Sequence, residues 1–124
     1  MFIEIKSNSQ NPRKFIHGVA TNDADYFTQY KGKTCPYYSR WRKMLERCYS
    51  VEWQESKPTY KECSVCNEWL LFSNFKSWMI NQDWIGKELD KDIINNGNKT
   101  YSPENCAFVS RKVNLLIQIK PSIK

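Results

Sequence analysis

Four of the cysteines in this chain are candidate ligands for a structural metal ion. Cys63 and Cys66 are separated by two residues, which is the spacing of the two thiolates in one half of a zinc site. The sequence has no second pair with this spacing, so the other two ligands would be the single residues Cys48 and Cys106. The alternative is that these cysteines are small apolar side chains in a core. A structural Zn²⁺ held by Cys48, Cys63, Cys66 and Cys106 is therefore one open interpretation.

The number of cysteines also indicates whether the protein belongs to a reducing or an oxidising compartment. There are five of them, and an odd number argues against a fully paired disulfide framework. The first residues, MFIEIKSNSQNPRK, contain no basic segment leading into a long apolar run, and no stretch approaches the ~18 apolar residues of a membrane span. We therefore expect a protein of a reducing compartment with no membrane partner, in which Cys35, beside Pro36, takes no part in the site.

Composition narrows the class of protein and partner. The chain has 124 residues, enough for one domain with one modest core. Its 19 Lys+Arg and 13 Asp+Glu give a net charge of +6, which favours a polyanionic partner such as nucleic acid. Aromatic residues make up 15% of the chain. They can fill the core, which is the default, or stack on bases.

A basic amphipathic helix is predicted from Tyr38. Trp41, Met44, Leu45 and Cys48 recur at i, i+3, i+4 and i+7 and would form its buried face. Around the rest of the helix lie four basic residues, Arg40, Arg42, Lys43 and Arg47. They form either a phosphate-contacting surface or an ordinary solvated face.

The other elements are expected to be short. We expect a first strand over 2–6 and a second strand in 15–20 that ends at Gly18. Residues 21–36 are expected to be irregular, and residues 51–59 to form a polar loop. Phe72, Phe75, Trp78 and Met79 indicate a helix for which Ser73 could be the N-cap. The last third predicts a strand in 87–93, a loop over 94–104, a strand over 105–110 and a helix over 111–120 that Pro121 ends.

That last third resembles a known family. The segment LDKDIINNGNKTYSPENCAFVSRKVN is similar to the ββα-metal core of the HNH (His-Me finger) nucleases, and is closest to their phage and homing-enzyme branch. Upstream, GVATNDADY, CPYYSRWRKMLERCYS and VCNEWLLFSNFKSW resemble the N-terminal parts of small phage-encoded proteins of this type. The resemblance covers most of the chain from about Gly18, and it implies the cytoplasm of a phage-infected bacterium as the location.

The resemblance assigns roles to individual residues. It implies that Asp90 and Asn114 hold a metal ion and that Asn105 braces the loop between the two strands. A carboxylate and an amide oxygen suit Mg²⁺ or Mn²⁺, which would polarise the scissile phosphate. Asn and Asp in such a loop are also ordinary turn residues. Asn114 discriminates between these interpretations, because Asn is a weak helix former in a helix interior.

One position departs from the family pattern. The family's general base is a histidine directly after the metal-binding aspartate, and this chain has Lys91 there. A free lysine has a pKa of about 10.4, so Lys91 is expected to pair with a phosphate rather than to accept a proton from water. The other conceivable bases are His17, the only histidine, together with Asp92 and Tyr101. Arg111 and Lys112, at the start of the last predicted helix, add to the nucleic-acid-binding surface.

The expected fold is α+β, a small single domain. Residues 1–37 would form an N-terminal β and irregular segment, and residues 38–124 a helical region plus the HNH-like ββα-metal core. Three functions remain open. The first is a phage-type DNA-binding protein on this scaffold with weak or lost hydrolysis. The second is an active Mg²⁺-dependent endonuclease that uses Lys91 or another base. The third is an inhibitor that binds a host protein.

Overall fold

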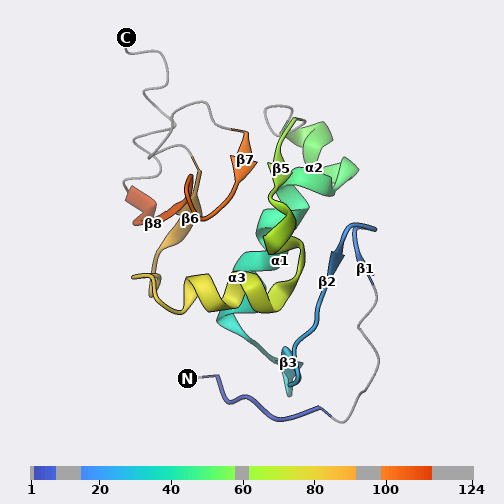
Figure 1. Cartoon of the computed structure of the whole chain (residues 1–124), viewed down its shortest axis with the longest axis vertical. Coiled ribbons are helices and arrows are strands. Elements are labelled where there is room, and N and C mark those ends of the chain that lie inside the picture. Colours follow the sequence, from blue (N-terminus) through green and yellow to red (C-terminus); the bar gives the residue numbers. More distant parts are fainter. Residues whose placement is uncertain (1, 8–14, 58–61, 92–98, 113–124) are drawn as a thin grey trace.

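Helix α1 (Pro36–Tyr49) runs through the middle of the molecule, and the other elements are arranged around it (Figure 1). The structure is a computed structural model that describes residues 2–7, 15–57, 62–91 and 99–112. These ranges hold three α-helices, one short 3₁₀ helix and four two-stranded sheets, so the fold is mixed α+β.

The prediction of a helix from Tyr38 is confirmed. Its buried residues are Tyr38 and the four residues with helical spacing, namely Trp41, Met44, Leu45 and Cys48. The helix begins two residues before the predicted start, because Pro36 fits the first turn, where its missing N–H is not needed. The amphipathic pattern therefore places the centre of the core along one face of α1.

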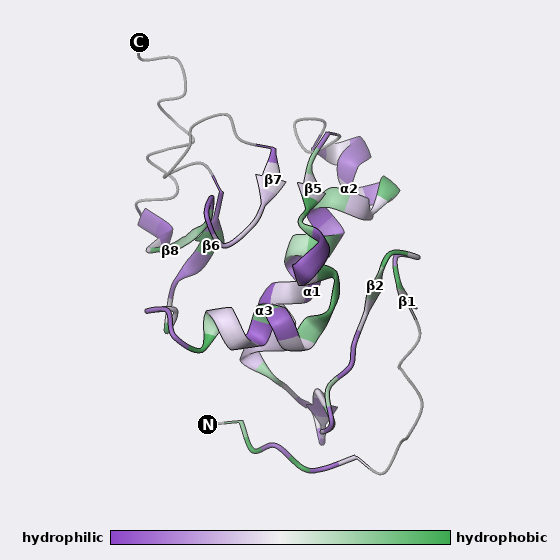
Figure 2. Cartoon of the chain, viewed as in Figure 1, coloured by the Kyte–Doolittle hydropathy of each residue, from purple (hydrophilic) through white to green (hydrophobic). Residues whose placement is uncertain are grey.

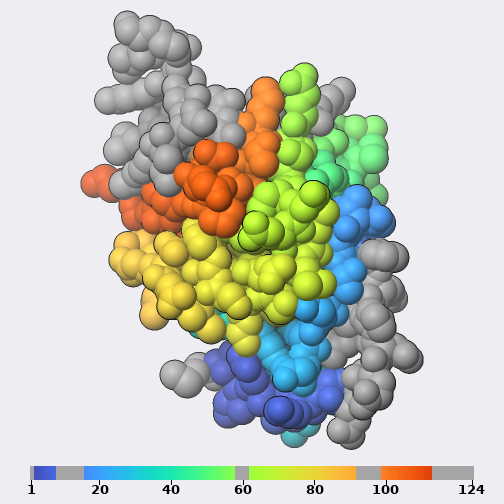
Figure 3. All heavy atoms as spheres, viewed as in Figure 1, coloured from blue at the N-terminus to red at the C-terminus, as the bar shows by residue number. Residues whose placement is uncertain are grey.

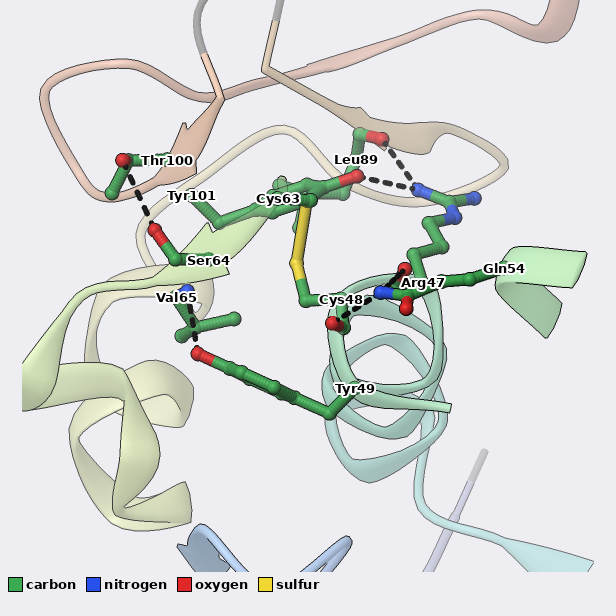
Figure 4. Close-up of a disulfide and its surroundings, with 10 residues drawn as sticks. All are labelled: Arg47, Cys48, Tyr49, Gln54, Cys63, Ser64, Val65, Leu89, Thr100 and Tyr101. Atoms are coloured by element: carbon green, nitrogen blue, oxygen red, sulfur yellow. Dashed lines mark hydrogen bonds between the residues drawn. A yellow bond between two sulfur atoms is a disulfide. The ribbon is translucent and has the colours of Figure 1, made fainter. Parts of the chain in front are cut away.

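A second helix, α2 (Val51–Ser56), replaces part of the predicted polar loop. Ser50 caps it, since its Oγ accepts a hydrogen bond from the amide of Trp53 at 3.2 Å. The Gln54 side chain donates to the carbonyl oxygens of Arg47 and Cys48 at the end of α1 (Figure 4). The loop prediction was wrong because these side-chain bonds stabilise a turn whose sequence carries no apolar period.

Helix α3 (Phe72–Met79) confirms the second predicted helix, and a 3₁₀ helix, η2 (Asn67–Leu70), precedes it. Its N-cap is Leu71 and not Ser73. The carboxylate of Asp23, 50 residues away in the chain, accepts hydrogen bonds from the Ser73 amide at 2.8 Å and from the Ser73 hydroxyl. A distant side chain thus supplies the acceptor that the local sequence lacks at the start of α3.

Asp23→Ala should therefore lower the free energy of unfolding by about 1 kcal/mol, the usual effect of losing a capping acceptor. Urea unfolding followed by far-UV circular dichroism measures the change. Asp25→Asn is the matched control, because the Asp25–Lys6 ion pair is 3.9 Å long and largely exposed and should contribute less than about 0.5 kcal/mol. Equal losses in the two variants would contradict the capping role.

The N-terminal part contains two small hairpins. β1 (Phe15–Ile16) pairs with β2 (Ala20–Thr21), so the single strand expected here is broken by a turn in which His17 and Gly18 have positive φ angles of 53° and 74°. β3 (Gln29–Tyr30) pairs with β4 (Lys33–Thr34) inside the segment that was expected to be irregular. Residues 2–6 form no strand, and Lys6 makes only an isolated bridge with Tyr26.

The C-terminal part contains the two predicted strands. β6 (Glu88–Asp90) and β8 (Ala107–Val109) pair antiparallel, which confirms the strands expected in 87–93 and 105–110. The predicted loop between them contains an additional strand, β7 (Thr100–Tyr101), which pairs parallel with β5 (Ser64–Val65). Arg111 and Lys112 are helical, and the rest of the helix predicted to residue 120 lies outside the described residues.

Aromatic rings are the largest side chains of the core. The largest fully buried side chains include Trp41, Trp69, Tyr101, Phe72 and Phe75. The Trp41 indole donates to the Trp69 carbonyl oxygen at 2.7 Å, which ties α1 to η2. The expectation that rings fill the core is confirmed for these residues, and the hydropathy colouring places the apolar segments of α1 and α3 where the two helices meet (Figure 2).

Candidate functional site

The paired strands β6 and β8 bring several of the predicted site residues together. Asp90, the last residue of β6, is in register with Ala107, the first residue of β8. Lys91 follows Asp90 directly, and Cys106 precedes Ala107. Along the chain, β7 lies between these two antiparallel strands, and the helical residues Arg111 and Lys112 follow β8.

The end of β6 is a buried and polar environment. Asp90 is 8% exposed, and Cys106 is 3% exposed. Burial raises the pKa of the Cys106 thiol to about 12, and the negative charge of Asp90 acts in the same direction, whereas a backbone hydrogen bond from Ser102 opposes the rise. Cys106 is therefore a neutral thiol at neutral pH.

Lys91 lies against an aromatic ring. Its Nζ is 5.8 Å from the centre of the Tyr101 ring, and Tyr101 is 1% exposed. The face of an aromatic ring attracts a cation, so the Tyr101 ring helps to hold the Lys91 side chain at the end of β6. An ammonium can bind a phosphate oxygen but cannot accept a proton.

The other conceivable bases are placed differently. The Tyr101 hydroxyl accepts a hydrogen bond from Arg47 Nη1 at 3.3 Å. His17 is exposed in the β1–β2 turn, which lies on the other side of α1 from β6 and β8 (Figure 1). Asn105 lies in the turn before β8, where its amide donates to the Ser102 carbonyl oxygen at 3.1 Å. Asp92 and Asn114 lie outside the described residues.

The basic residues of α1 are not a uniform surface. Arg47 Nη1 donates to the Leu89 carbonyl oxygen at 3.5 Å and to the Tyr101 hydroxyl, so Arg47 links α1 to β6 and β7 (Figure 4). Arg40 donates to the Lys87 carbonyl oxygen at 3.5 Å and stacks on Trp84. Arg40 and Arg47 thus hold α1 against β6, a role that the sequence pattern did not indicate.

Lys43 completes a basic row beside β6. It is exposed, and it falls between Arg40 and Arg47 at helical spacings of three and four residues. Arg42 is also exposed but lies on a different face, where its guanidinium carbon is 5.8 Å from the centre of the Tyr38 ring. The row of Arg40, Lys43 and Arg47 therefore adjoins the β6–β8 pair, and Arg42 does not belong to it.

The four candidate zinc ligands fall into two pairs. Cys48, in the last turn of α1, and Cys63, before β5, form a disulfide with a Cα–Cα distance of 4.8 Å (Figure 4). Cys66 and Cys106 are free thiols. Burial raises the pKa of Cys66. A four-thiolate zinc site would require the Cys48–Cys63 bond to be reduced, because only thiolates bind the metal.

Metal binding has little support from the residues at hand. In the ranges that the structure describes, no three His, Cys, Asp or Glu side chains come together in a way that could hold a metal ion. Of the two proposed Mg²⁺ or Mn²⁺ ligands only Asp90 is described, and one carboxylate does not make a site.

Comparison with known proteins gives no guidance on identity. No family model, curated protein or solved structure matches the chain. Among the described helices none has the length and apolar character needed to cross a membrane. The function must therefore be argued from the residues themselves.

Proposed function

We propose that this chain binds nucleic acid, with DNA as the first ligand to test, through a basic surface formed by β6, β8 and the neighbouring row on α1. The observation that carries the proposal is the pair of bonds from α1 to the backbone around β6, from Arg40 to the Lys87 carbonyl and from Arg47 to the Leu89 carbonyl. These bonds hold the helix face that carries the exposed Lys43 next to β6, which ends at Asp90 and is followed by Lys91.

Basic residues also lie at both ends of the β6–β8 ladder, next to the row on α1. The ladder has three register pairs, with Lys91 just past one end and Arg111 past the other. At about 3.4 Å per residue, these ends are on the order of 15 Å apart. Arg111 and Lys112 are exposed in the first helical turn after β8. One nucleic-acid backbone could therefore contact Lys43, Lys91 and the helix start together, which suits binding through phosphates.

The proposal includes weak or lost hydrolysis. By the sequence resemblance, Lys91 stands where those nucleases have the histidine that acts as general base, and a free lysine, with a pKa of about 10.4, is a poor proton acceptor at neutral pH. An active endonuclease is the second candidate, and it is favoured by one feature, the buried carboxylate of Asp90 at the end of β6 beside Lys91. An inhibitor of a host protein is the third candidate, and it has no specific support among these contacts.

Fluorescence anisotropy with a labelled 20-base-pair duplex over a salt series tests the proposal. Lys43→Gln should weaken binding and reduce the slope of log Kobs against log salt by about 0.9, the value for one phosphate contact. Arg111→Gln with Lys112→Gln should reduce the slope by about twice that amount. Arg42→Gln is the matched control, with the same loss of charge on another face of α1, and should leave the slope unchanged.

Incubation of plasmid with wild type and Asp90→Ala, with Mg²⁺ or Mn²⁺, separates the three candidates. A mobility shift with intact plasmid supports the binding function. Nicking by the wild type that Asp90→Ala abolishes would establish the endonuclease instead. The absence of both cleavage and shift would overturn the proposal and leave the protein-binding candidate.

A further inference from the structure

A second basic and apolar surface lies at the opposite end of the molecule, around the N-terminal residues (Figure 3). It contains a surface pocket of about 270 Å³, with an N-terminal wall of apolar side chains and a hairpin wall that carries a tyrosine and two lysines. The lining residues are Phe2, Ile3, Ile5, Tyr30, Lys31 and Lys33. None of the described residues that line this pocket is a carboxylate.

The β3–β4 hairpin positions the basic wall. Tyr30 and Lys33 are register partners, so their side chains project from the same face of the hairpin. Lys31 and Gly32 form the turn with positive φ angles of 50° and 77°, the backbone of a tight two-residue hairpin loop. This turn brings Lys31 Nζ to 5.5 Å from the centre of the Tyr30 ring. One ring and two ammonium groups are thereby fixed around the pocket.

Two rings at this end, Phe27 and Tyr30, are exposed, unlike those of the core. Phe27 and Tyr30 are 39% and 38% exposed, and their rings stack with centres 5.7 Å apart and an interplanar angle of 27°. Ile3, on the facing wall, is 72% exposed. A stacked aromatic pair at the surface is already held in an orientation that offers a flat face to a third planar group.

We propose that this pocket binds an unpaired nucleotide, with its base stacked on Tyr30 and its phosphates paired with Lys31 and Lys33. The inference rests on the proposed function and deepens it, since it assigns single-stranded nucleic acid to a surface separate from the β6–β8 face. Aromatic stacking combined with neighbouring cations is how proteins bind single strands without regard to sequence. Among the described lining residues the charged side chains are Lys31 and Lys33, so the pocket is complementary in charge to a phosphate.

The test compares a labelled single-stranded 12-mer with a duplex of the same sequence. Tyr30→Ala should weaken binding of the single strand about 5- to 100-fold, the range measured for the loss of one stacked base, and change duplex binding less than about 2-fold. Tyr30→Trp keeps a stacking ring and should retain binding. Lys31→Gln with Lys33→Gln should reduce the salt slope for the single strand by about 0.7 per phosphate contact. Ile85→Ala, at a 77% exposed site outside the pocket, is the matched control.

Quenching of a 2-aminopurine base in the oligonucleotide gives a direct signature of stacking, and it should disappear in Tyr30→Ala. Equal binding of the single strand by wild type and Tyr30→Ala would overturn the inference about the pocket. In that case, loss of duplex binding in the double variant Arg111→Gln, Lys112→Gln would still support the proposed function. If neither oligonucleotide binds the wild type, both proposals fail. Binding of an acidic, leucine-rich peptide that Tyr30→Ala loses, with no effect on the oligonucleotide, would assign the pocket to a protein partner.

Discussion

Trp41→Ala should lower the free energy of unfolding by about 3–5 kcal/mol, the usual cost of removing a fully buried tryptophan. Trp41 is completely buried in α1 and its ring contacts Tyr38 and Phe72, with ring centres 5.8 and 5.2 Å away. A domain of this size is stable by only about 5–15 kcal/mol. The variant should therefore lose a large fraction of its total stability, and with it the attachment of η2 and α3 to α1.

Urea unfolding followed by circular dichroism measures this loss, and Trp41→Phe divides it into two parts. Phenylalanine keeps much of the apolar contact but leaves the Trp69 carbonyl oxygen without the indole N–H that now lies at 2.7 Å. An unpaired buried acceptor costs about 1–3 kcal/mol. Val51→Ala, at a 70% exposed site, is the control and should change stability by less than about 0.5 kcal/mol. A loss below about 1.5 kcal/mol in Trp41→Ala would contradict the central role of this residue.

Elements with a strong apolar period could be predicted from the sequence, and elements held by distant partners could not. The buried face of α1 and the strands β6 and β8 follow from local patterns. α2 has no buried residue, and it depends on the Ser50 cap and on Gln54. β7 is a strand because its two residues pair with the two residues of β5. Each residue of β7 lies 36 positions after its partner in the chain. The signal for α2 is a local cap without an apolar period, and the signal for β7 does not appear in any window of neighbouring residues.

The candidate site was predictable in its residue types but not in its geometry. Lys91 and Asp90 lie at the end of a strand, as the motif indicates. From the sequence pattern, the four basic residues of α1 are equivalent. In the structure, Arg40 and Arg47 lie against β6, whereas Arg42 contacts Tyr38. Helical spacing alone does not reveal which face of a basic helix meets a neighbouring strand. Only the tertiary contacts show this. They separate Arg42 from the row of Arg40, Lys43 and Arg47.

Reduction of the Cys48–Cys63 disulfide should destabilise the protein by about 3 kcal/mol, the chain-entropy value for a loop of 15 residues. For a domain of this length, such a loss corresponds to a decrease in Tm of roughly 10 °C. The reason lies mainly in the unfolded chain, which the bond restricts between the last turn of α1 and the start of β5. Thermal unfolding in oxidising and reducing buffer measures the difference, with a thiol count to confirm the redox state of each sample.

Two variants make this prediction specific. Cys48→Ala with Cys63→Ala should unfold near the reduced wild type and should not respond to reductant, because alanine can replace a small buried thiol without leaving a polar group. Cys66→Ala is the matched control, a free thiol three residues from Cys63, and should keep the full response. Identical Tm values for wild type in both buffers would contradict the role of the disulfide. If zinc instead restores the Tm of the reduced wild type, and Cys66→Ala abolishes this effect, then the four-cysteine site that the sequence left open forms once the bond is reduced. Structural zinc would stabilise the fold through its thiolate ligands.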